Sequence, residues 1–163
     1  MAQFYLLAIP VLIGLIAGMF LAFYPETEPE PSLLTASKLI DGGSSIMGNS
    51  NAPITILEWG DYQCTFCYKF HQNTLNTIQE DFINTGKVKL VFKDFPLNGP
   101  DSLLAAEAAY CAEDQGKYWE YHSTLYSNQL GVDNGWASTA NLKNYASDLG
   151  LDMDLFASCL DSG

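Results

Sequence analysis

The stretch ITILEWGDYQCTFC, residues 54–67, decides the fold of this chain. Residues 54–59 form a β-branched apolar run that a single acid, Glu58, interrupts, and such a run predicts a buried strand. Cys64 follows after a short polar turn. Residues 65–83 then predict a helix, because apolar side chains recur along one face at helical spacing. The side chains expected to face inward are Cys67, Phe70, Leu75, Ile78 and Phe82.

A second strand is predicted over residues 88–95, VKLVFKDF, and Pro96 ends it. No tight hairpin joins the two strands, so the order strand, helix, strand predicts a parallel pair with a right-handed crossover. The chain beyond Pro96 predicts helices, since Gly and Asn turns separate segments with an apolar stripe. Four helices are expected, over residues 103–113, 117–128, 138–149 and 152–160. The predicted fold class is α/β, with a βαβ half at residues 51–97 and a helical part at 98–163.

The N-terminal segment predicts a membrane anchor. Residues 4–24, FYLLAIPVLIGLIAGMFLAFY, contain no charge, and about 20 apolar residues span the core of a bilayer. No basic segment precedes the run and no convincing cleavage site follows it, so an uncleaved transmembrane signal anchor at residues 1–24 is favoured over a cleaved signal peptide. Acids follow the run and the terminal amine precedes it, so we expect the domain on the extracytoplasmic side of the cell membrane.

Residues 25–50 predict a tether between the anchor and the domain. They open with PETEPEP, which is acidic and Pro-rich and should be extended. They continue through the Gly- and Ser-rich residues 41–45, which should be flexible. The domain itself is expected at residues 51–163.

The charge of the chain excludes one class of partner. Nineteen acids face seven lysines, with no arginine, and the net charge is −12. Proteins that bind nucleic acids need clustered cations to neutralise phosphates, so nucleic acid is not expected as a partner. Docking of the domain on an anionic lipid surface is disfavoured for the same reason.

Cys64 and Cys67 are the candidate catalytic residues. The turn from strand to helix places Cys64 at a helix N-terminus, where free backbone N–H groups and the helix dipole stabilise a thiolate. Cys67 lies one turn further and could resolve a mixed disulfide. A structural disulfide between the two is less favoured, because it would close too short a loop to stabilise much. Half of a zinc site is also less favoured, since no second ligand pair has metal spacing. The pair therefore predicts a redox-active disulfide with no metal and no other cofactor.

Three segments in this order resemble the DsbA-like branch of the thioredoxin superfamily: ILEWGDYQCTFCYKFH, KVKLVFKDFPL and AAEAAYCAEDQGKYWEYHSTLY. The resemblance covers residues 48–163. It implies a thioredoxin-like fold with an all-helical insertion, and oxidation or sometimes isomerisation of disulfides in exported proteins. The expected partners are thus exported proteins with thiols and a redox partner that recycles the pair.

Glu58 and Lys93 each interrupt an apolar strand, and adjacent parallel strands could pair them beneath the cysteines. The resemblance supports a role for Glu58, because family members keep an acid in this strand. Such a buried acid could relay a proton for Cys67. A salt bridge with no catalytic part is the open alternative.

Thr65 and Phe66, between the cysteines, are expected to tune the redox potential. Thr65 offers a hydroxyl, whereas Phe66 offers neither a hydrogen bond nor a charge to a thiolate. This pair matches neither the Pro-His common in the DsbA family nor the Gly-Pro of thioredoxins. The direction of the reaction therefore depends on the compartment, which favours oxidation.

Three other polar side chains near the predicted site receive structural interpretations. Asp61 is expected to be a turn residue. His71, one turn beyond Cys67, is expected to be solvated or packed on a face. His122 is expected on a helix surface.

Cys111 and Cys159 each lie on the apolar face of a predicted helix. A structural disulfide between them would close a loop of about 48 residues, worth roughly 4 kcal/mol in the loop-entropy model. Two free buried thiols are the alternative.

The resemblance also implies a second half of the fold, with two antiparallel strands, a cis-proline loop and a last helix. No strand pattern and no proline follow Pro100. The second half of the sheet is therefore expected to be missing, and a C-terminally incomplete domain is expected to be poorly stable and poorly active.

The leading functional hypothesis is a membrane-anchored extracytoplasmic thiol–disulfide oxidoreductase that oxidises dithiols. A disulfide reductase or isomerase is the alternative within enzymes. A metal-binding or chaperone-like thiol module and a non-catalytic tethered interaction domain are alternatives from other classes.

Overall fold

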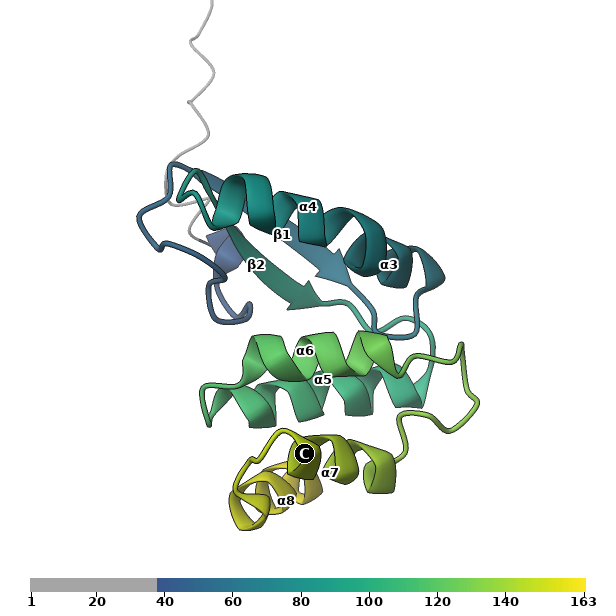
Figure 1. Cartoon of the computed structure of the whole chain (residues 1–163). Helices are drawn as coiled ribbons and strands as arrows, with labels where there is room; N and C mark the ends of the chain where they lie inside the picture. Colours follow the sequence, from purple (N-terminus) through teal and green to yellow (C-terminus); the bar gives the residue numbers. More distant parts are fainter. Residues whose placement is uncertain (1–37) are drawn as a thin grey trace, which may run out of the picture. The chain divides into compact units, whose positions relative to one another are not determined.

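The computed structural model of the protein describes residues 38–163 (Figure 1). The predicted transmembrane anchor and the first half of the predicted tether, residues 25–37, lie outside these residues. Among residues 38–163, no helix has both the length and the apolar character needed to cross a bilayer.

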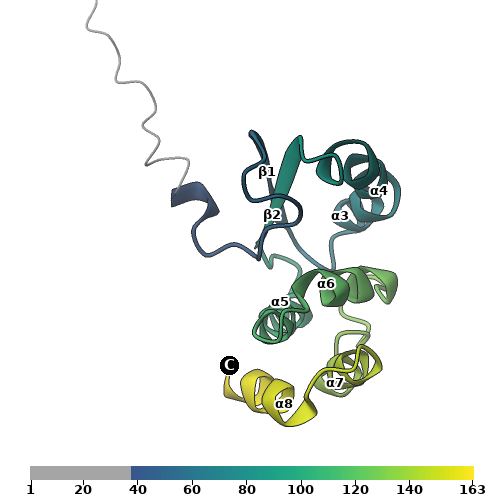
Figure 2. The same ribbon diagram turned by 60° about the vertical axis from the view of Figure 1, so that its left-hand side comes forward.

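The sheet of the described residues consists of two parallel strands, β1 (Ile54–Gly60) and β2 (Val88–Asp94). Both predicted strands and their parallel pairing are confirmed. The register pairs Glu58 with Phe92 and Trp59 with Lys93. β2 is the more buried strand, because the helical connection between the strands covers one face and residues 44–47 run along its outer edge (Figure 2).

The connection between the strands is helical over residues 65–83, as predicted. It is built from α3 (Thr65–Lys69), η1 (Phe70–Leu75), α4 (Asn76–Ile78) and η2 (Gln79–Ile83), and η1 and η2 are π-helical. The wider i→i+5 turns of a π-helix rotate the side chains relative to an α-helix. Ile83 is consequently buried and Phe82 is exposed, which corrects the expectation that Phe82 faces inward.

Residues 43–47 overlap the stretch 41–45 that is expected to be flexible, and their backbone is held by hydrogen bonds to β2. The Ser44 N–H donates to the Phe92 carbonyl at 2.8 Å, and Met47 pairs with Leu90 in an antiparallel bridge. Unpaired backbone groups on the edge of β2 offer partners to a passing chain, which explains why this segment is ordered. Gly43 permits the approach, since a Cβ there would lie 2.5 Å from Val91 Cγ1.

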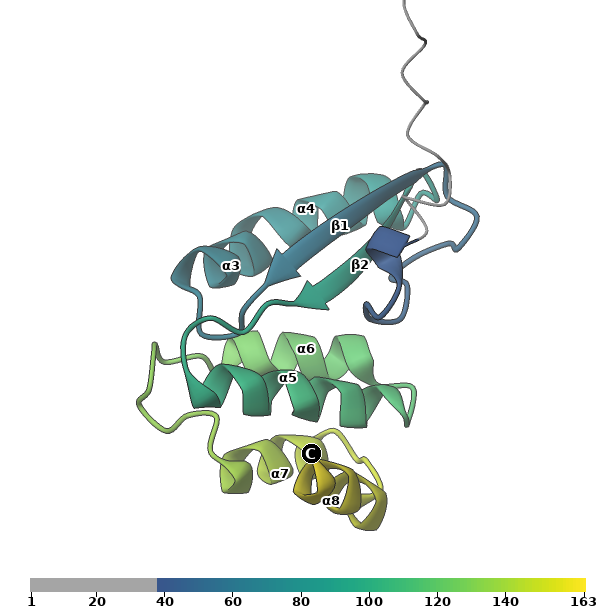
Figure 3. The ribbon, with the colours of Figure 1, turned by 180° about the vertical axis from the view of Figure 1, so that it is seen from behind.

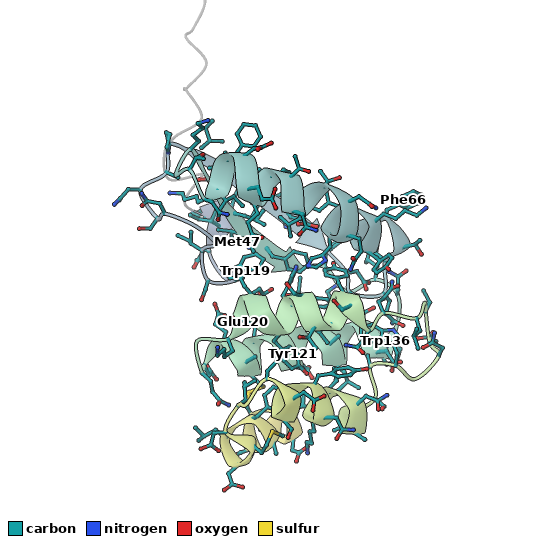
Figure 4. The ribbon with its side chains drawn as sticks, viewed as in Figure 1. Met47, Phe66, Trp119, Glu120, Tyr121 and Trp136 are labelled. Carbon is teal, nitrogen blue, oxygen red and sulfur yellow. A yellow bond between two sulfur atoms is a disulfide. The ribbon has the colours of Figure 1, made fainter. Side chains whose placement is uncertain are left out.

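The same segment also contacts the helical part. Trp119 Nε1 donates to the Ser45 carbonyl at 2.9 Å. Trp119 and Met47 both pack against a small core that consists of Leu75, Ile83, Val88 and Leu90 (Figure 4). The C-terminal end of the predicted tether is therefore part of the folded domain.

Four helices follow the strands, as predicted: α5 (Pro100–Glu113), α6 (Tyr118–Ser127), α7 (Thr139–Asp148) and α8 (Met153–Ser162). Side chains cap the N-termini of α7 and α8. The Ser138 hydroxyl accepts from the Asn141 N–H, and the Asp152 carboxylate accepts from two N–H groups of the first turn of α8. α5 and α6 run side by side next to the strands, and α7 and α8 lie on their far side (Figures 1 and 3).

The larger of two cores lies among these helices. α5 contributes alanines, which let the neighbouring helices approach closely, and α6 contributes Tyr121 and Leu125. The βαβ half adds Tyr62 and Phe92 to this core. A separate small core, between the helical connection and β2, consists of Leu75, Ile83, Val88 and Leu90.

The structure joins Cys111 of α5 to Cys159 of α8 by a disulfide, with 5.7 Å between the Cα atoms. The bridge spans 48 residues of sequence and links α5, in the layer of helices next to the strands, to α8 in the layer on its far side. The alternative of two free buried thiols does not match this structure.

Candidate redox site

Cys64 stands at the junction between β1 and the helix, where the sequence places it. Its N–H donates to the Asp61 carbonyl at 2.9 Å, and this bond closes the turn 61–64. Cys64 has extended backbone angles and is the N-cap of α3, so its side chain faces the open N–H groups of the helix. The Cys67 N–H donates to Cys64 Sγ at 3.3 Å. The half-buried Cys64 side chain therefore lies at the N-terminal end of the helix, within reach of an approaching thiol.

Cys67 is held as a neutral thiol. Burial raises its pKa to about 11, the hydrogen bond with the Cys64 thiol acts in the same direction, and so does the nearby charge of Glu58. A thiol with such a pKa is protonated at neutral pH, and it must lose its proton before it can attack a disulfide. The two cysteines are thus chemically unequal, which fits a nucleophile and a resolving thiol.

Glu58 lies on β1, six residues before Cys64, and is half buried. Burial raises the pKa of its carboxyl from 4.5 to about 7. The carboxylate also contributes to the raised pKa values of Cys67 and Tyr126, so it acts electrostatically on the redox pair. A carboxyl that titrates near neutral pH is suited to exchanging a proton with a neighbouring thiol.

The expected pair between Glu58 and Lys93 is not present. The register aligns Glu58 with Phe92 and Lys93 with Trp59. Successive side chains of a strand point to opposite faces, so this offset of one residue places the acid and the lysine on opposite sides of the sheet. The Lys93 ammonium instead donates to the Asp41 carbonyl at 2.5 Å.

Thr65 and Phe66 lie in the first turn of α3, and both are exposed. Phe66 points outward from the helix with 79% of its surface accessible (Figure 4). Lys69 Nζ lies 5.5 Å from the centre of its ring. Phe66 therefore presents an apolar surface to whatever approaches Cys64.

Asp61 and Gln63 are polar residues of the site whose importance the sequence reasoning missed. The carboxylate of Asp61 is buried and accepts hydrogen bonds from Gln63, Leu97, Asn98 and Ser102. Gln63 is fully buried. An acid in a turn carries the same local signal whether or not a distant loop covers it, so only the unusual density of polar residues before Cys64 could have pointed to this cluster.

His122 is not a surface residue, contrary to the expectation from its helix. It is fully buried, and its Nδ1 lies 2.9 Å from the Tyr62 hydroxyl. Its ring centre is 4.7 Å from that of Phe92 on β2 and 5.0 Å from that of Tyr126. Burial, with a smaller contribution from His71, holds the pKa of His122 well below 6.5. The expectation was wrong because the face of α6 that carries His122 packs against β2.

His71 is packed on a face, which was one of the two expected environments. Its ring stacks on Tyr126 at 4.9 Å between centres, and burial lowers its pKa. Within residues 38–163, no three His, Cys, Asp or Glu side chains are grouped so that they could hold a metal ion.

Comparisons with known proteins agree with this geometry. The profile of the family described as Thioredoxin matches residues 41–163. Disulfide bond formation protein D of Bacillus subtilis is 33% identical over 128 residues, which are 71% of this chain and 58% of that protein. Probable disulfide bond formation protein D of Bacillus anthracis is 33% identical over 100 residues, 60% of this chain and 46% of that protein. The chain thus spans about half the length of these curated relatives.

Solved structures are similar as well. The oxidised crystal structure of BdbD from Bacillus subtilis superimposes with a TM-score of 0.67 at 30% identity, covering 73% of this chain and 66% of that one. Wolbachia pipientis alpha-DsbA1 gives a TM-score of 0.64 at 27% identity, covering 74% of this chain and 60% of that one.

Proposed function

This chain belongs to the thioredoxin family, in its DsbA-like branch, and we propose that it is a membrane-anchored extracytoplasmic thiol–disulfide oxidoreductase that oxidises dithiols in exported proteins. The observation that carries the proposal is the inequality of the two thiols. Cys64 is half exposed at a helix N-cap, and Cys67 is a thiol with a pKa of about 11. Cys64 is thereby suited to exchange with a client sulfur, and Cys67 is suited to leave the disulfide and later to re-form it.

The oxidising half-reaction starts from the Cys64–Cys67 disulfide. A client thiolate attacks Cys64 Sγ, the bond between the two cysteines breaks, and Cys67 takes the electron pair and a proton. A second client thiolate then attacks the client sulfur of the mixed disulfide, which closes the client disulfide and releases Cys64 as a thiolate. Two electrons have passed from the client to the pair, and a recycling partner must accept them before the next turnover.

Glu58 supplies the proton that this sequence requires. Its pKa of about 7 lets it hold a proton at neutral pH, donate it to Cys67 when that sulfur leaves, and take it back during reoxidation. Glu58 is therefore proposed as the general acid and base of the pair. Lys93 has no part in this step, because it lies on the other side of the sheet.

The location and the direction of the reaction belong to the same proposal. Residues 4–24 are long and apolar enough to anchor the domain, and acids follow them. Two of the relatives are named for disulfide bond formation, which is a statement about those proteins and supports oxidation here. The cysteine bridge between α5 and α8 also suits an oxidising compartment.

Equilibration of the full chain with glutathione buffers tests the direction. The fraction of Cys64–Cys67 disulfide is measured by alkylation and mass spectrometry at each ratio of oxidised to reduced glutathione. We expect a midpoint more positive than about −200 mV, in the range of oxidising members of the superfamily. A midpoint near −270 mV, typical of thioredoxin, would instead establish a reductase. Stoichiometric zinc or copper in the purified protein would favour the metal-binding module.

The anchor is tested separately in cells. Sodium carbonate extraction should leave the full chain in the membrane pellet, and a variant that lacks residues 4–24 should be released. A membrane-impermeant thiol reagent should label Cys64 in intact cells if the domain is extracytoplasmic. Protection of Cys64 until the cells are lysed would contradict that orientation.

A further inference from the structure

The carboxylate of Asp61 links the turn before Cys64 to the start of the helical insertion through hydrogen bonds. Oδ1 accepts from the Gln63 N–H at 2.7 Å and from the Ser102 hydroxyl at 2.7 Å. Oδ2 accepts from the Leu97 N–H at 2.7 Å, and from the N–H and side-chain amide of Asn98 at 2.9 Å each. Both oxygens are thus fully used by donors from the turn, the loop 97–99 and the first turn of α5.

The side chain of Gln63 extends this attachment to a second loop. Its Nε2 donates to the Asn98 carbonyl at 2.7 Å and to the Ser102 hydroxyl at 2.9 Å. Its Oε1 accepts from the N–H of Asp133 at 2.7 Å, in the loop between α6 and α7. A single buried amide therefore joins the redox turn to both loops of the insertion that reach it.

The two loops also approach each other closely at Gly99 and Asp133. Gly99 has a φ of 101°, a conformation that favours glycine, and a Cβ there would lie 2.9 Å from Asp133 Oδ1 in the second loop. Asp133 itself has a φ of 50°, the one positive value among the non-glycine residues that the structure describes. Such a backbone conformation persists only where its surroundings impose it.

Burial of a carboxylate and an amide is costly unless every polar atom has a partner, and a fully connected network fixes one geometry. The network formed by Asp61, Gln63 and their partners is called the clamp below. It lies directly before the nucleophile, and the loops that it holds carry exposed apolar side chains. Leu97 is 70% exposed, Leu130 76% and Val132 50%.

We propose that Asp61 and Gln63 are positioning residues, which set the place of the Cys64 thiol relative to the two insertion loops and hold the apolar side chains of those loops beside it as the contact surface for a client. The clamp thereby makes the helical insertion part of the redox site. Only the client contact rests on the function proposed above. The positioning of Cys64 does not depend on it.

Two nearly isosteric substitutions in the full chain test the clamp. D61N replaces an acceptor oxygen by a donor that faces the N–H groups it used to bind. Q63E replaces a donor by an oxygen that faces the Asn98 carbonyl. D101N and Q72E are matched controls that make the same chemical changes near the site without touching the clamp. The first readout is the rate at which iodoacetamide alkylates Cys64, followed by mass spectrometry of the Cys64 peptide.

Both clamp variants should change the alkylation rate of Cys64 by about fivefold or more, since a displacement of roughly 1 Å can change reactivity up to about 100-fold. The second readout is oxidation of a reduced dithiol peptide with apolar flanking residues. Its KM should rise by about fivefold or more in the clamp variants, with a smaller change in kcat. The controls should stay within about twofold of the wild type in both readouts.

The outcomes separate the two proposals. If the wild type fails to oxidise any dithiol while D61N and Q63E still alter Cys64 alkylation, the proposed function is rejected and the positioning role stands. If the folded clamp variants alkylate and bind peptide like the controls, the positioning role is overturned. Should D61N not fold, S102A removes one donor to Asp61 and one acceptor for Gln63, and a shift of about twofold to threefold in the same direction is expected.

Discussion

The βαβ segment, residues 54–94, contains fewer buried side chains than the helical segment, residues 100–162. The small core between the connecting helix and the sheet contains four buried side chains, and Ile54 and Trp59 of β1 are exposed. The helices instead enclose an alanine- and tyrosine-rich core and are bridged by a disulfide. The segment that carries the redox pair therefore contains fewer buried side chains than the helical segment.

The difference separates stability from chemistry. The βαβ segment holds Glu58 and Cys67, whose pKa values are moved to about 7 and about 11 by partial burial. Groups of that kind destabilise a fold when charged, and they serve proton transfer. The helical segment holds apolar contacts and a covalent bridge, and it supplies the rigid support to which the clamp attaches the redox turn.

The largest expected effect comes from C64S, which tests whether the chemistry belongs to the βαβ segment alone. Loss of the nucleophile should lower disulfide exchange by more than about 1,000-fold, because no other thiol occupies the helix N-cap. The thermal unfolding midpoint should hardly move, since Cys64 is half exposed. C67S is the matched control: its Cys64 thiolate should attack a disulfide-bonded peptide and accumulate as a mixed disulfide, because no Cys67 thiol remains to release the peptide. Exchange that persists in C64S would place the chemistry elsewhere.

The second effect concerns the bridge of the helical segment. Replacement of Cys111 and Cys159 by alanine together should lower the free energy of unfolding by about 4 kcal/mol, from the entropy of the 48-residue loop. Urea unfolding followed by circular dichroism measures this loss. At low denaturant, the alkylation rate of Cys64 should stay that of the wild type. A parallel loss of Cys64 reactivity would show that the two segments are not separable in this way.

The third effect is a gain in stability from E58Q. The folded-state pKa of about 7 lies above the usual 4.5, so the folded protein binds this proton more tightly than the unfolded chain does. Wild-type stability is therefore lost as pH rises from about 4.5 to 7, and at pH 8 E58Q should be more stable by ~1–3 kcal/mol. At pH 4 the two proteins should unfold alike. Disulfide exchange by E58Q should also lose its pH dependence near 7, and an unchanged profile would contradict the proton-transfer role.

The smallest effect concerns His122, at the boundary of the two segments. Its pKa is held below 6.5 in the folded protein, so the unfolded chain binds the proton first as pH falls. Stability should drop below pH 6.5, by up to about 1.4 kcal/mol per pH unit for one proton. H122Q should flatten this slope, which urea unfolding between pH 5 and 8 measures. H71Q is the comparison variant. If the stability of H122Q depends on pH as steeply as that of the wild type, groups other than His122 take up the proton.

Local signals predicted much of the fold. Strand, helix and strand around Cys64 follow from runs of apolar residues and from the turns between them. Ser138 and Asp152 begin helices because short polar side chains can accept from N–H groups two or three residues ahead. The four helices after Pro96 were predicted from their apolar stripes and from the Gly and Asn turns that separate them.

Non-local contacts explain the failures. Residues 41–45 look flexible by composition, but the edge of β2 gives hydrogen-bond partners to Ser44 and to the adjoining Met47. Glu58 and Lys93 look complementary, but the strand register separates them. His122 looks like a surface residue of an amphipathic helix, and only the packing of α6 on β2 buries it.

The sequence by itself determined that a strand would deliver Cys64 to a helix N-terminus and place Cys67 one turn behind it, because both depend on residues within a few positions of each other. Only the tertiary structure decided what surrounds these thiols. The raised pKa values of Glu58 and Cys67 come from burial. The clamp joins Asp61 to a residue 41 positions away and Gln63 to one 70 positions away. Desolvation and long-range hydrogen bonds require a packed partner, and no local pattern of residues carries that information.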